Sequence, residues 1–247
     1  MKNLVRKTLG RFGLELRRTQ DESVPYENFL NLVLAYEQRY MDLGGVIPSN
    51  DLRPKLLSRL MGTPPSEAYA IIESLEKTKN LSGDICEFGV AQGATTSIIA
   101  NEISQSSEKV LHLFDSFEGL PKPTEKDELK DDIFSLGSME AYEGTMSCPE
   151  DMVKTRLKAI QFPDDRCVIH KGFIETSIQG NENLPQQVSF AYIDFDFYEP
   201  IKIALEFLHQ ISPVGAIFVV DDYDFFSTGV KTAVEEFLEE RKNESST

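Results

Sequence analysis

Two apolar runs in the C-terminal half of the chain each end in carboxylates. One leads from Phe190 into Asp194 and Asp196, and the other leads from Gly215 into Asp221 and Asp222. Uninterrupted apolar runs bounded by turn residues are typical of strands buried on both faces, as in a parallel sheet. Between the runs, apolar residues fall at helical spacing, at Ile201, Ala204, Leu205 and Leu208. The pattern predicts a right-handed strand–helix–strand unit with both carboxylate clusters at the C-terminal edge of one sheet.

The rest of the pattern also alternates helices and strands, and no linker divides it. Helices are predicted over residues 26–40, 56–61, 67–79, 94–102, 149–160, 200–210 and 229–241, and further strands over 84–89, 110–115 and 166–170. Residues 118–147 form a long polar insertion without a strong period, and such a loop is usually functional or disordered. We therefore expect one α/β domain over 61–247, carrying this insertion, after a helical N-terminal extension over 1–60.

Length, charge and cysteine usage narrow the class of protein. A chain of 247 residues is long enough for one large α/β domain with an extension. A formal net charge of −16 argues against a nucleic-acid partner, because neutralising phosphates takes Lys and Arg. The three cysteines are isolated, without metal-binding or redox spacing, and Cys86 lies in a strand-like run where a buried structural thiol is expected.

The N-terminus differs in charge from the remainder of the chain. Residues 1–20 hold Glu15 and six basic side chains, Lys2, Arg6, Lys7, Arg11, Arg17 and Arg18. A basic amphipathic helix over 1–18 either rests on an anionic membrane surface or packs on its own domain or a partner subunit, and both alternatives are open. The sequence contains neither an apolar run of about 18 residues nor a signal peptide with a cleavage site, so a cytoplasmic location is expected.

Four aspartates are predicted to converge at the C-terminal edge of the sheet. Asp194 and Asp196 point to the same side of their strand, whereas the adjacent Asp221 and Asp222 require a turn to begin at one of them. Carboxylates so close together repel one another unless a cation or a proton lies among them, and oxygen-only ligands favour Mg²⁺. The alternative is that Asp221 and Asp222 only stabilise the turn after the strand.

The turn Gly89–Gly93 follows the first strand, and Asp115 ends the next one, an arrangement that indicates a nucleoside-bearing cofactor. A Walker A loop requires a Lys after its last glycine, and no Lys follows Gly93. A dinucleotide fingerprint requires a glycine at the position of Ala91. S-adenosylmethionine has no phosphates, so the turn need only let the backbone approach it, while Glu87 faces its cationic methionine end.

Taken together, these segments resemble the macrocin O-methyltransferase family, metal-dependent enzymes that methylate sugar hydroxyls on macrolide and aminocoumarin antibiotics. The resemblance runs from about Leu60 to Phe237 and rests on residues 83–93, 114–121, 142–145, 171–173, 194–200, 221–223 and 229–234. It implies an α/β class I methyltransferase fold, a three-layer Rossmann-like arrangement around a mostly parallel sheet.

The resemblance also implies roles for individual residues. S-adenosylmethionine would contact Glu87, Gly89, Ala91, Gly93, Asp115, Ser116, Gly172 and Phe173. Mg²⁺ would be held by Asp194, Asp221 and Asp222, and Asp196 would be the catalytic general base. The insertion 118–147 would be a lid over the acceptor, against the alternative of a solvated loop.

The sequence departs from the family pattern in two places. The aromatic and Arg residues of the family's first turn are Ala91 and Gln92 here. The class I fold also normally continues with two further strands, which find no counterpart before Thr247. We therefore expect the strand at 216–220 to be an exposed edge unless a partner subunit or the N-terminal segment covers it, or the chain is truncated. A homo-oligomer is expected on this ground.

The sequence thus predicts an S-adenosylmethionine- and Mg²⁺-dependent O-methyltransferase. Its acceptor would be a small molecule or carbohydrate: a sugar or polyol hydroxyl of a glycoside, polysaccharide or natural product. Two alternatives remain, a catechol-type diol as acceptor and a non-catalytic scaffold of the same fold.

Overall fold

The computed structural model describes residues 23–60, 62–106, 108–179 and 182–244. Its centre is a sheet of five strands: β1 (Asp84–Phe88), β2 (Leu111–Asp115), β3 (Cys167–Lys171), β4 (Val188–Ile193) and β5 (Ile217–Val220). The strands lie in the order β3-β2-β1-β4-β5, and every pair is parallel. Because all strands point the same way, their carboxyl ends meet at one edge of the sheet.

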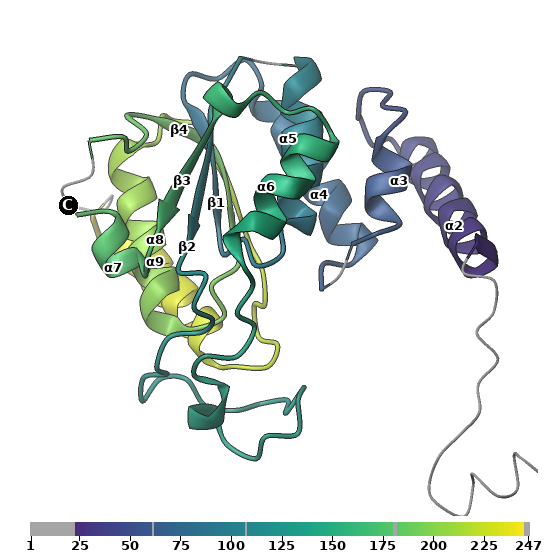
Figure 1. Ribbon diagram of the computed structural model, residues 1–247. Coiled ribbons are helices and arrows are strands. Elements are labelled where there is room, and N and C mark those ends of the chain that lie inside the picture. Colours follow the sequence, from purple (N-terminus) through teal and green to yellow (C-terminus); the bar gives the residue numbers. More distant parts are fainter. Residues whose placement is uncertain (1–22, 61, 107, 180–181, 245–247) are drawn as a thin grey trace, which may run out of the picture.

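Helices cover both faces of this sheet, so the fold has three layers (Figure 1). On one face lie α4 (Pro65–Thr78), α5 (Ala94–Ser106) and α6 (Glu150–Ala159), and on the other α7 (Ile174–Ser177), α8 (Tyr198–Ile211) and α9 (Gly229–Glu244). The α/β class I methyltransferase fold predicted from the sequence is confirmed.

Alternating side chains of β1 supply the two cores. Ile85 packs with α4, α5 and α6, whereas Cys86 and Phe88 pack with α7, α8 and α9. Cys86 is fully buried and unpaired, as expected of a structural thiol. Burial on both faces explains why these strands appear in the sequence as continuous apolar runs rather than as an apolar–polar alternation.

The N-terminal helices α2 (Ser23–Asp42) and α3 (Arg53–Leu57) pack outside α4 and α5 (Figure 1). Helix α3 begins at Arg53 and not at Leu56 as predicted, because Pro54 takes a first-turn position, where its missing N–H costs no hydrogen bond. The predicted basic helix over 1–18 and its membrane contact lie outside the described residues.

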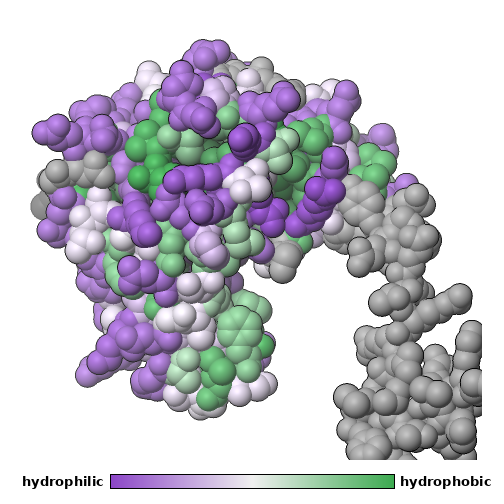
Figure 2. Space-filling view, viewed as in Figure 1, coloured by the Kyte–Doolittle hydropathy of each residue, from purple (hydrophilic) through white to green (hydrophobic). Residues whose placement is uncertain are grey.

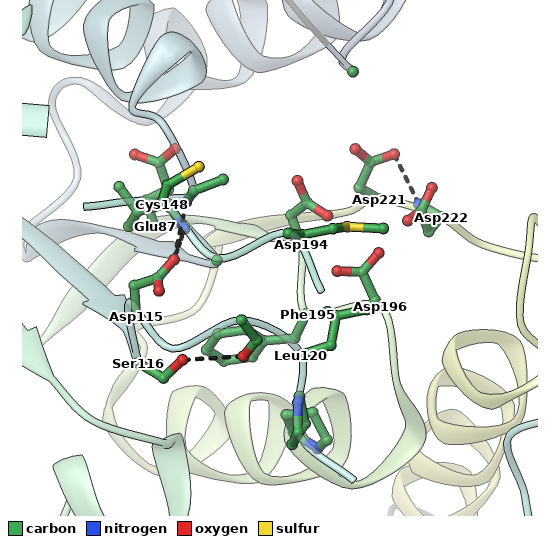
Figure 3. A pocket seen from close by; sticks show the side chains of 18 of the residues that line it. Glu87, Asp115, Ser116, Leu120, Cys148, Asp194, Phe195, Asp196, Asp221 and Asp222 are labelled. Carbon is green, nitrogen blue, oxygen red and sulfur yellow. Dashed lines mark hydrogen bonds between the residues drawn. The ribbon is translucent and has the colours of Figure 1, made fainter. Parts of the chain in front are cut away.

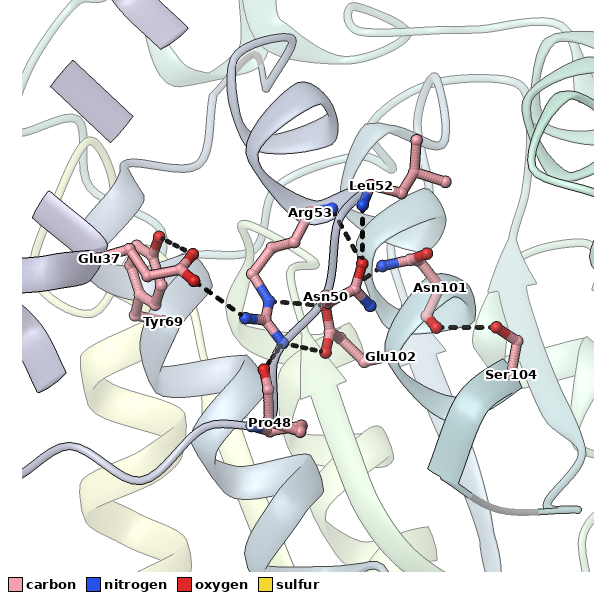
Figure 4. A network of polar contacts seen from close by, with 9 residues as sticks. All are labelled: Glu37, Pro48, Asn50, Leu52, Arg53, Tyr69, Asn101, Glu102 and Ser104. Atoms are coloured by element: carbon pink, nitrogen blue, oxygen red, sulfur yellow. Dashed lines mark hydrogen bonds and ion pairs between the residues drawn. The ribbon is translucent and has the colours of Figure 1, made fainter. Parts of the chain in front are cut away.

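A buried guanidinium joins this N-terminal part to the sheet domain (Figure 4). Arg53 is fully buried and forms a bidentate pair with Glu102 of α5, at 2.8 Å from Nε and 2.7 Å from a terminal nitrogen. It also contacts Glu37 of α2 at 3.4 Å and donates to the carbonyl of Pro48 at 2.8 Å. The network links α2, α3 and α5 through one side chain.

The insertion 118–147 is packed against the domain and contains the short helix η1 (Met139–Tyr142). Met139 and Tyr142 are buried against Phe197 and Phe226, which flank the two acidic turns of the sequence. Strand β5 pairs with β4 alone among the described residues, so the edge expected there is present. Within the same residues no helix is both long and apolar enough to cross a membrane.

Candidate active site

A cavity of about 620 Å³ opens at the carboxyl ends of β1, β2, β4 and β5 (Figure 3). It is lined by all but one of the site residues predicted from the sequence, namely Glu87, Gly89, Ala91, Asp115, Ser116, Gly172, Phe173, Asp194, Asp196, Asp221 and Asp222. Gly93 is the exception: it packs beside Val153 of α6, where an added Cβ would lie 3.1 Å from the Val153 Cα. This contact brings the turn close to a neighbouring helix, and cofactor binding by Gly93 stays a prediction.

Gly89 sits where the ends of β1 and β4 almost touch. Its φ is +82°, and a Cβ added there would lie 1.7 Å from the backbone oxygen of Asp194. The Asp194 amide in turn donates to the carbonyl of Phe88 at 2.7 Å. Only a residue without a side chain fits this crossing, which holds the first turn beside the acidic residues of β4.

Asp115 shapes the first turn from the end of β2. One carboxylate oxygen accepts the amides of Val90 at 2.7 Å and Ala91 at 2.9 Å, and the other accepts the amide of Phe117 at 2.6 Å. Ala91 has a φ of +44°, a left-handed conformation that costs energy for any residue with a Cβ. The Asp115 bonds thus hold an unfavourable backbone conformation at the cavity wall.

Glu87 is fully buried, and neither of its carboxylate oxygens has a hydrogen-bond partner among the described residues. Burial raises the pKa of this carboxyl to about 8. A buried acid without a partner is costly to ionise, and such groups in a cavity commonly await a ligand that donates to them. The amine and hydroxyl groups of S-adenosylmethionine are donors of the kind this carboxylate lacks.

The acidic residues beyond β4 and β5 come together as a tight group. Ligand oxygens of Asp194, Asp196 and Asp222 lie within 4.8 Å of one another. Burial raises the pKa of Asp194 and of Asp196 well above the usual range, and the neighbouring negative charges raise both further. Oxygen ligands at this spacing fit a hard divalent cation, which would relieve the repulsion.

Asp221 is oriented differently from the other three aspartates (Figure 3). One of its oxygens accepts the hydroxyl of Tyr192 at 2.6 Å, and the other accepts the amide of Asp222 at 2.7 Å. Because both oxygens already have partners, its role as a metal ligand stays a prediction. Asp196 takes its place in the close group.

Two of the grouped aspartates have left-handed backbones, with φ of 61° at Asp196 and 54° at Asp222. Asp tolerates this conformation better than most residues, yet it still costs energy relative to an extended strand. Such conformations gather at functional sites, where the surrounding structure holds them in place. Both residues line the cavity.

Sequence reasoning missed a further acid, Glu67, in the first turn of α4. Burial, together with the charge of Asp221, raises its pKa to about 8, and its Oε1 atom is buried without a hydrogen-bond partner among the residues that the structure describes. An acid in the first turn of a helix is explained by the positive end of the helix dipole alone. Nothing in the local pattern of α4 indicates that its first turn faces β4 and β5.

Apolar side chains of the insertion also line the cavity and were not predicted. Leu120, Ile133, Phe134 and Met146 come from the insertion, and Phe195 and Phe225 from the two acidic turns. His112 and His170, by contrast, are buried in adjacent strands with their ring nitrogens 2.9 Å apart, so they are core residues.

The fold and the cavity define a class I methyltransferase, with the glycine turn after β1 and an acid at the end of β2. The family model described as Macrocin-O-methyltransferase (TylF) matches residues 67–246. The chain therefore belongs to this family of O-methyltransferases, and S-adenosylmethionine is its cofactor.

Solved structures support the fold. The O-methyltransferase NovP superposes with a TM-score of 0.62 at 17% identity, covering 90% of this chain and 92% of that chain. CalS11, a calicheamicin methyltransferase, has a TM-score of 0.58 at 20% identity over 90% of this chain and 86% of that one. A second structure of CalS11, described as a TDP-rhamnose 3'-O-methyltransferase, has a TM-score of 0.52. No curated protein matches the chain.

Proposed function

We propose that this protein is an Mg²⁺-dependent O-methyltransferase that acts on a sugar or polyol hydroxyl. The observation that carries the proposal is the group formed by Asp194, Asp196 and Asp222, which shares one cavity with the glycine turn and Glu87. NovP and CalS11 support it as relatives of similar fold, and CalS11 is described as acting on the sugar of TDP-rhamnose.

The cavity contains side chains suited to binding the cofactor and the metal ion. S-adenosylmethionine would supply the methyl group from beside Glu87 and the turn at Gly89. A divalent cation held by Asp194 and Asp222, with Asp221 as the third ligand predicted from the sequence, would lower the pKa of an acceptor hydroxyl. Orientation of the two reactants in the cavity would contribute much of the rate gain, at best about 7–11 kcal/mol.

The protein's own part in the reaction is to position the acceptor and remove a proton. Asp196 is 9% exposed and lies within the acidic group, in reach of a hydroxyl held there. The Asp196 carboxylate would accept the proton of the acceptor hydroxyl. The bound cofactor would supply the methyl group and leave as a neutral thioether. Asp196 lines the cavity, and its backbone has the left-handed conformation that is common at functional sites.

The test is Asp196→Asn, which keeps the shape of the side chain but cannot accept the proton. We expect turnover to fall by about 10²–10⁴-fold, with binding of S-adenosylhomocysteine unchanged by calorimetry. Asp224→Asn is the control, because Asp224 pairs with Lys130 and Lys231 and does not line the cavity. Full activity of Asp196→Asn would refute the base assignment, and a protein that binds the cofactor but methylates nothing would favour the scaffold alternative.

A further inference from the structure

A single buried carboxylate in the insertion accepts hydrogen bonds from three separate parts of the chain. Asp127 is 5% exposed, although it lies in a polar loop. One of its oxygens accepts the amide and the hydroxyl of Thr124, both at 2.8 Å, within the insertion. The other oxygen accepts the amide of Tyr198 at 2.8 Å and the hydroxyl of Ser227 at 3.3 Å. Asp127 therefore joins the insertion to the segments that follow the two acidic turns.

Each of these segments is the start of a helix. Tyr198 is the first residue of α8, and its amide is one of those that a helix leaves without an internal acceptor. Phe197, which precedes it, forms no side-chain cap. The Ser227 hydroxyl accepts the amide of Gly229, the first residue of α9, at 2.9 Å. A carboxylate at the starts of two helices is favourable, because the amino end of each helix is positive.

The approach of Asp127 to α9 leaves no space for a side chain at Gly229. A Cβ added there would lie 1.8 Å from an Asp127 oxygen and 2.7 Å from the amide nitrogen of Tyr198. The φ of Gly229 is not positive, so the lack of space, and not the backbone conformation, excludes a side chain. The carboxylate and the two helix starts are therefore in direct contact.

The start of α8 also holds the residue proposed as the base. Asp196 is the central residue of a three-residue turn, in which the amide of Phe197 donates to the carbonyl of Phe195 at 2.6 Å. With a φ of 61° at its centre, this turn is of the uncommon, strained kind. Strained conformations persist where the surrounding structure holds them. Strand β4 holds one side of this turn, and the hydrogen bond from Tyr198 to Asp127 holds the other.

The backbone of the insertion pairs with the segment that leads from Asp222 into α9. Residues 128–130 lie antiparallel to residues 226–228, and hydrogen bonds of 2.8 and 3.0 Å flank the bridge between Leu129 and Ser227. Figure 2 shows hydrophobic surface gathered over the insertion at the lower end of the molecule, beyond this pairing. The place of the whole insertion relative to the acidic residues thus depends on its contacts near Asp127.

The geometry points to Asp127 as a positioning residue for the acidic group of the cavity. By joining the starts of α8 and α9, it fixes the turn that carries Asp196 relative to the turn that carries Asp222, and it places the insertion relative to both. Asp127 does not line the cavity, so it acts through these turns and not by touching a reactant. The inference rests on the proposed function, in which Asp196 is the base and Asp222 is a metal ligand.

The test measures cation binding by the full chain, with Mn²⁺ as the probe in calorimetry and Co²⁺ as the probe in visible absorption spectroscopy. Asp127→Asn keeps the shape of the side chain but has an acceptor on one side only, so it cannot keep both pairs of hydrogen bonds. We expect the affinity for Mn²⁺ to fall by about tenfold, the lower end of the effect of removing a group that orients metal ligands. The Co²⁺ bands should shift, because they depend on the arrangement of the ligand oxygens.

Three variants separate positioning from folding. Ser227→Ala removes the link to α9 and keeps the bond to Tyr198, so it should weaken Mn²⁺ binding by less than about tenfold. Thr124→Val is the matched control: it loses a hydrogen bond to the same carboxylate on the insertion side, and Mn²⁺ binding should not change. Arg53→Met controls for lost stability, because it removes a buried ion pair of the N-terminal network, and it should bind Mn²⁺ as the wild type does.

Hydrogen exchange without added metal gives a second readout. The amides of residues 195–201 should exchange faster in Asp127→Asn than in the wild type, and those of β1 should exchange at the same rate. Binding of S-adenosylhomocysteine, measured by calorimetry, should also be unchanged, because the turn after β1 and the end of β2 make no contact with Asp127 through any of its four hydrogen bonds.

The outcomes distinguish the inference from the proposed function. Wild-type Mn²⁺ affinity and Co²⁺ bands in Asp127→Asn would overturn the inference and leave the proposed function standing. Equal losses in Asp127→Asn and Arg53→Met would do the same, since stability alone would then explain the effect. If Asp127→Asn does not fold, wild-type binding by Ser227→Ala would overturn the inference. A wild type that binds S-adenosylhomocysteine but neither cation would refute the metal-dependent function, and the inference would fail with it.

Discussion

At the scale of single residues, the site is built from acids whose environments oppose ionisation. Neither oxygen of Glu87 has a hydrogen-bond partner in the described part of the chain, Asp194 and Asp196 share a small volume, and Glu67 lies beside Asp221. Each is a place where the fold without ligands is less stable than it would be with neutral side chains. A bound cation and a bound cofactor would offset that cost. The same buried acids that lower the stability of the ligand-free fold would therefore favour ligand binding.

The substitution Glu87→Gln should separate the effect of this acid on stability from its effect on ligand binding. The folded-state pKa of Glu87 is about 8 against an ordinary value of 4.5, so its favourable contribution is complete below pH 4.5 and is lost as the pH rises through 8. We expect the ligand-free variant to be more stable than the wild type at pH 8, by on the order of 3 kcal/mol, and equal to it near pH 4.5.

Binding should change in the opposite sense. Loss of a charged hydrogen-bond acceptor should weaken S-adenosylhomocysteine binding by about 10–100-fold. Urea unfolding across this pH range and calorimetry measure the two effects, with Glu118→Gln, an exposed acid outside the cavity, as the control. If the free energies of unfolding of the variant and the wild type changed with pH in the same way, the raised pKa of Glu87 would be refuted.

At the scale of elements, the cavity depends on how closely the ends of β1 and β4 approach each other. Gly89 occupies that crossing, and the strands on either side carry Glu87 and Asp194. A shift of one strand end would therefore move the cofactor side of the cavity relative to the acidic side. The glycine is required by the contact between elements, and its positive φ alone would not demand it.

Comparing Gly89→Ala with Gly137→Ala tests this point. Both glycines have nearly the same φ, +82° and +85°, but an added Cβ meets the Asp194 oxygen at 1.7 Å in one and nothing within 4 Å in the other. We expect Gly137→Ala to lose about 1 kcal/mol, the cost of the left-handed conformation, and Gly89→Ala to lose about 3–4 kcal/mol. Chemical denaturation measures both, and equal losses would contradict the steric argument.

At the scale of the whole molecule, the N-terminal helices are joined to the sheet domain by an apolar cluster and by Arg53. The cluster contains Val33, Ile47 and Leu57 from one part and Tyr69, Ile72 and Ile98 from the other. The described part of the predicted N-terminal extension thus shares a core with the α/β domain, and the boundary at residue 60 stays a prediction. The homo-oligomer, and a partner that covers the exposed edge of β5, also stay predictions.

Removing the Arg53 side chain should reveal how much the buried pair matters. Arg53→Met leaves Glu102, 6% exposed, without its main partner, and we expect a loss of about 3–5 kcal/mol in unfolding free energy. Arg53→Met combined with Glu102→Leu should recover most of that loss, because no uncompensated charge stays buried. Lys77→Met, at an exposed pair with Glu73, should cost less than about 1 kcal/mol. An equally unstable double variant would contradict this account.

Much of the architecture follows from local patterns in the sequence. The apolar runs before Asp194 and Asp221, the helical spacing from Ile201 to Leu208, and the glycine turn after β1 each predict an element or its end. Parallel strands then bring their carboxyl ends to one edge, which is why the predicted site residues, Gly93 apart, line one cavity.

Other features depend on contacts between residues far apart in the chain. No periodic pattern in the sequence indicates four of these features. They are the hydrogen bond from Tyr192 to Asp221, the position of Glu67 beside Asp221, the place of Phe134 in the cavity lining and the burial of Arg53. Periodicity reports which face of an element is buried, because burial acts on each element separately. Which side chains meet is decided only when elements pack, since that depends on the distances and angles between them.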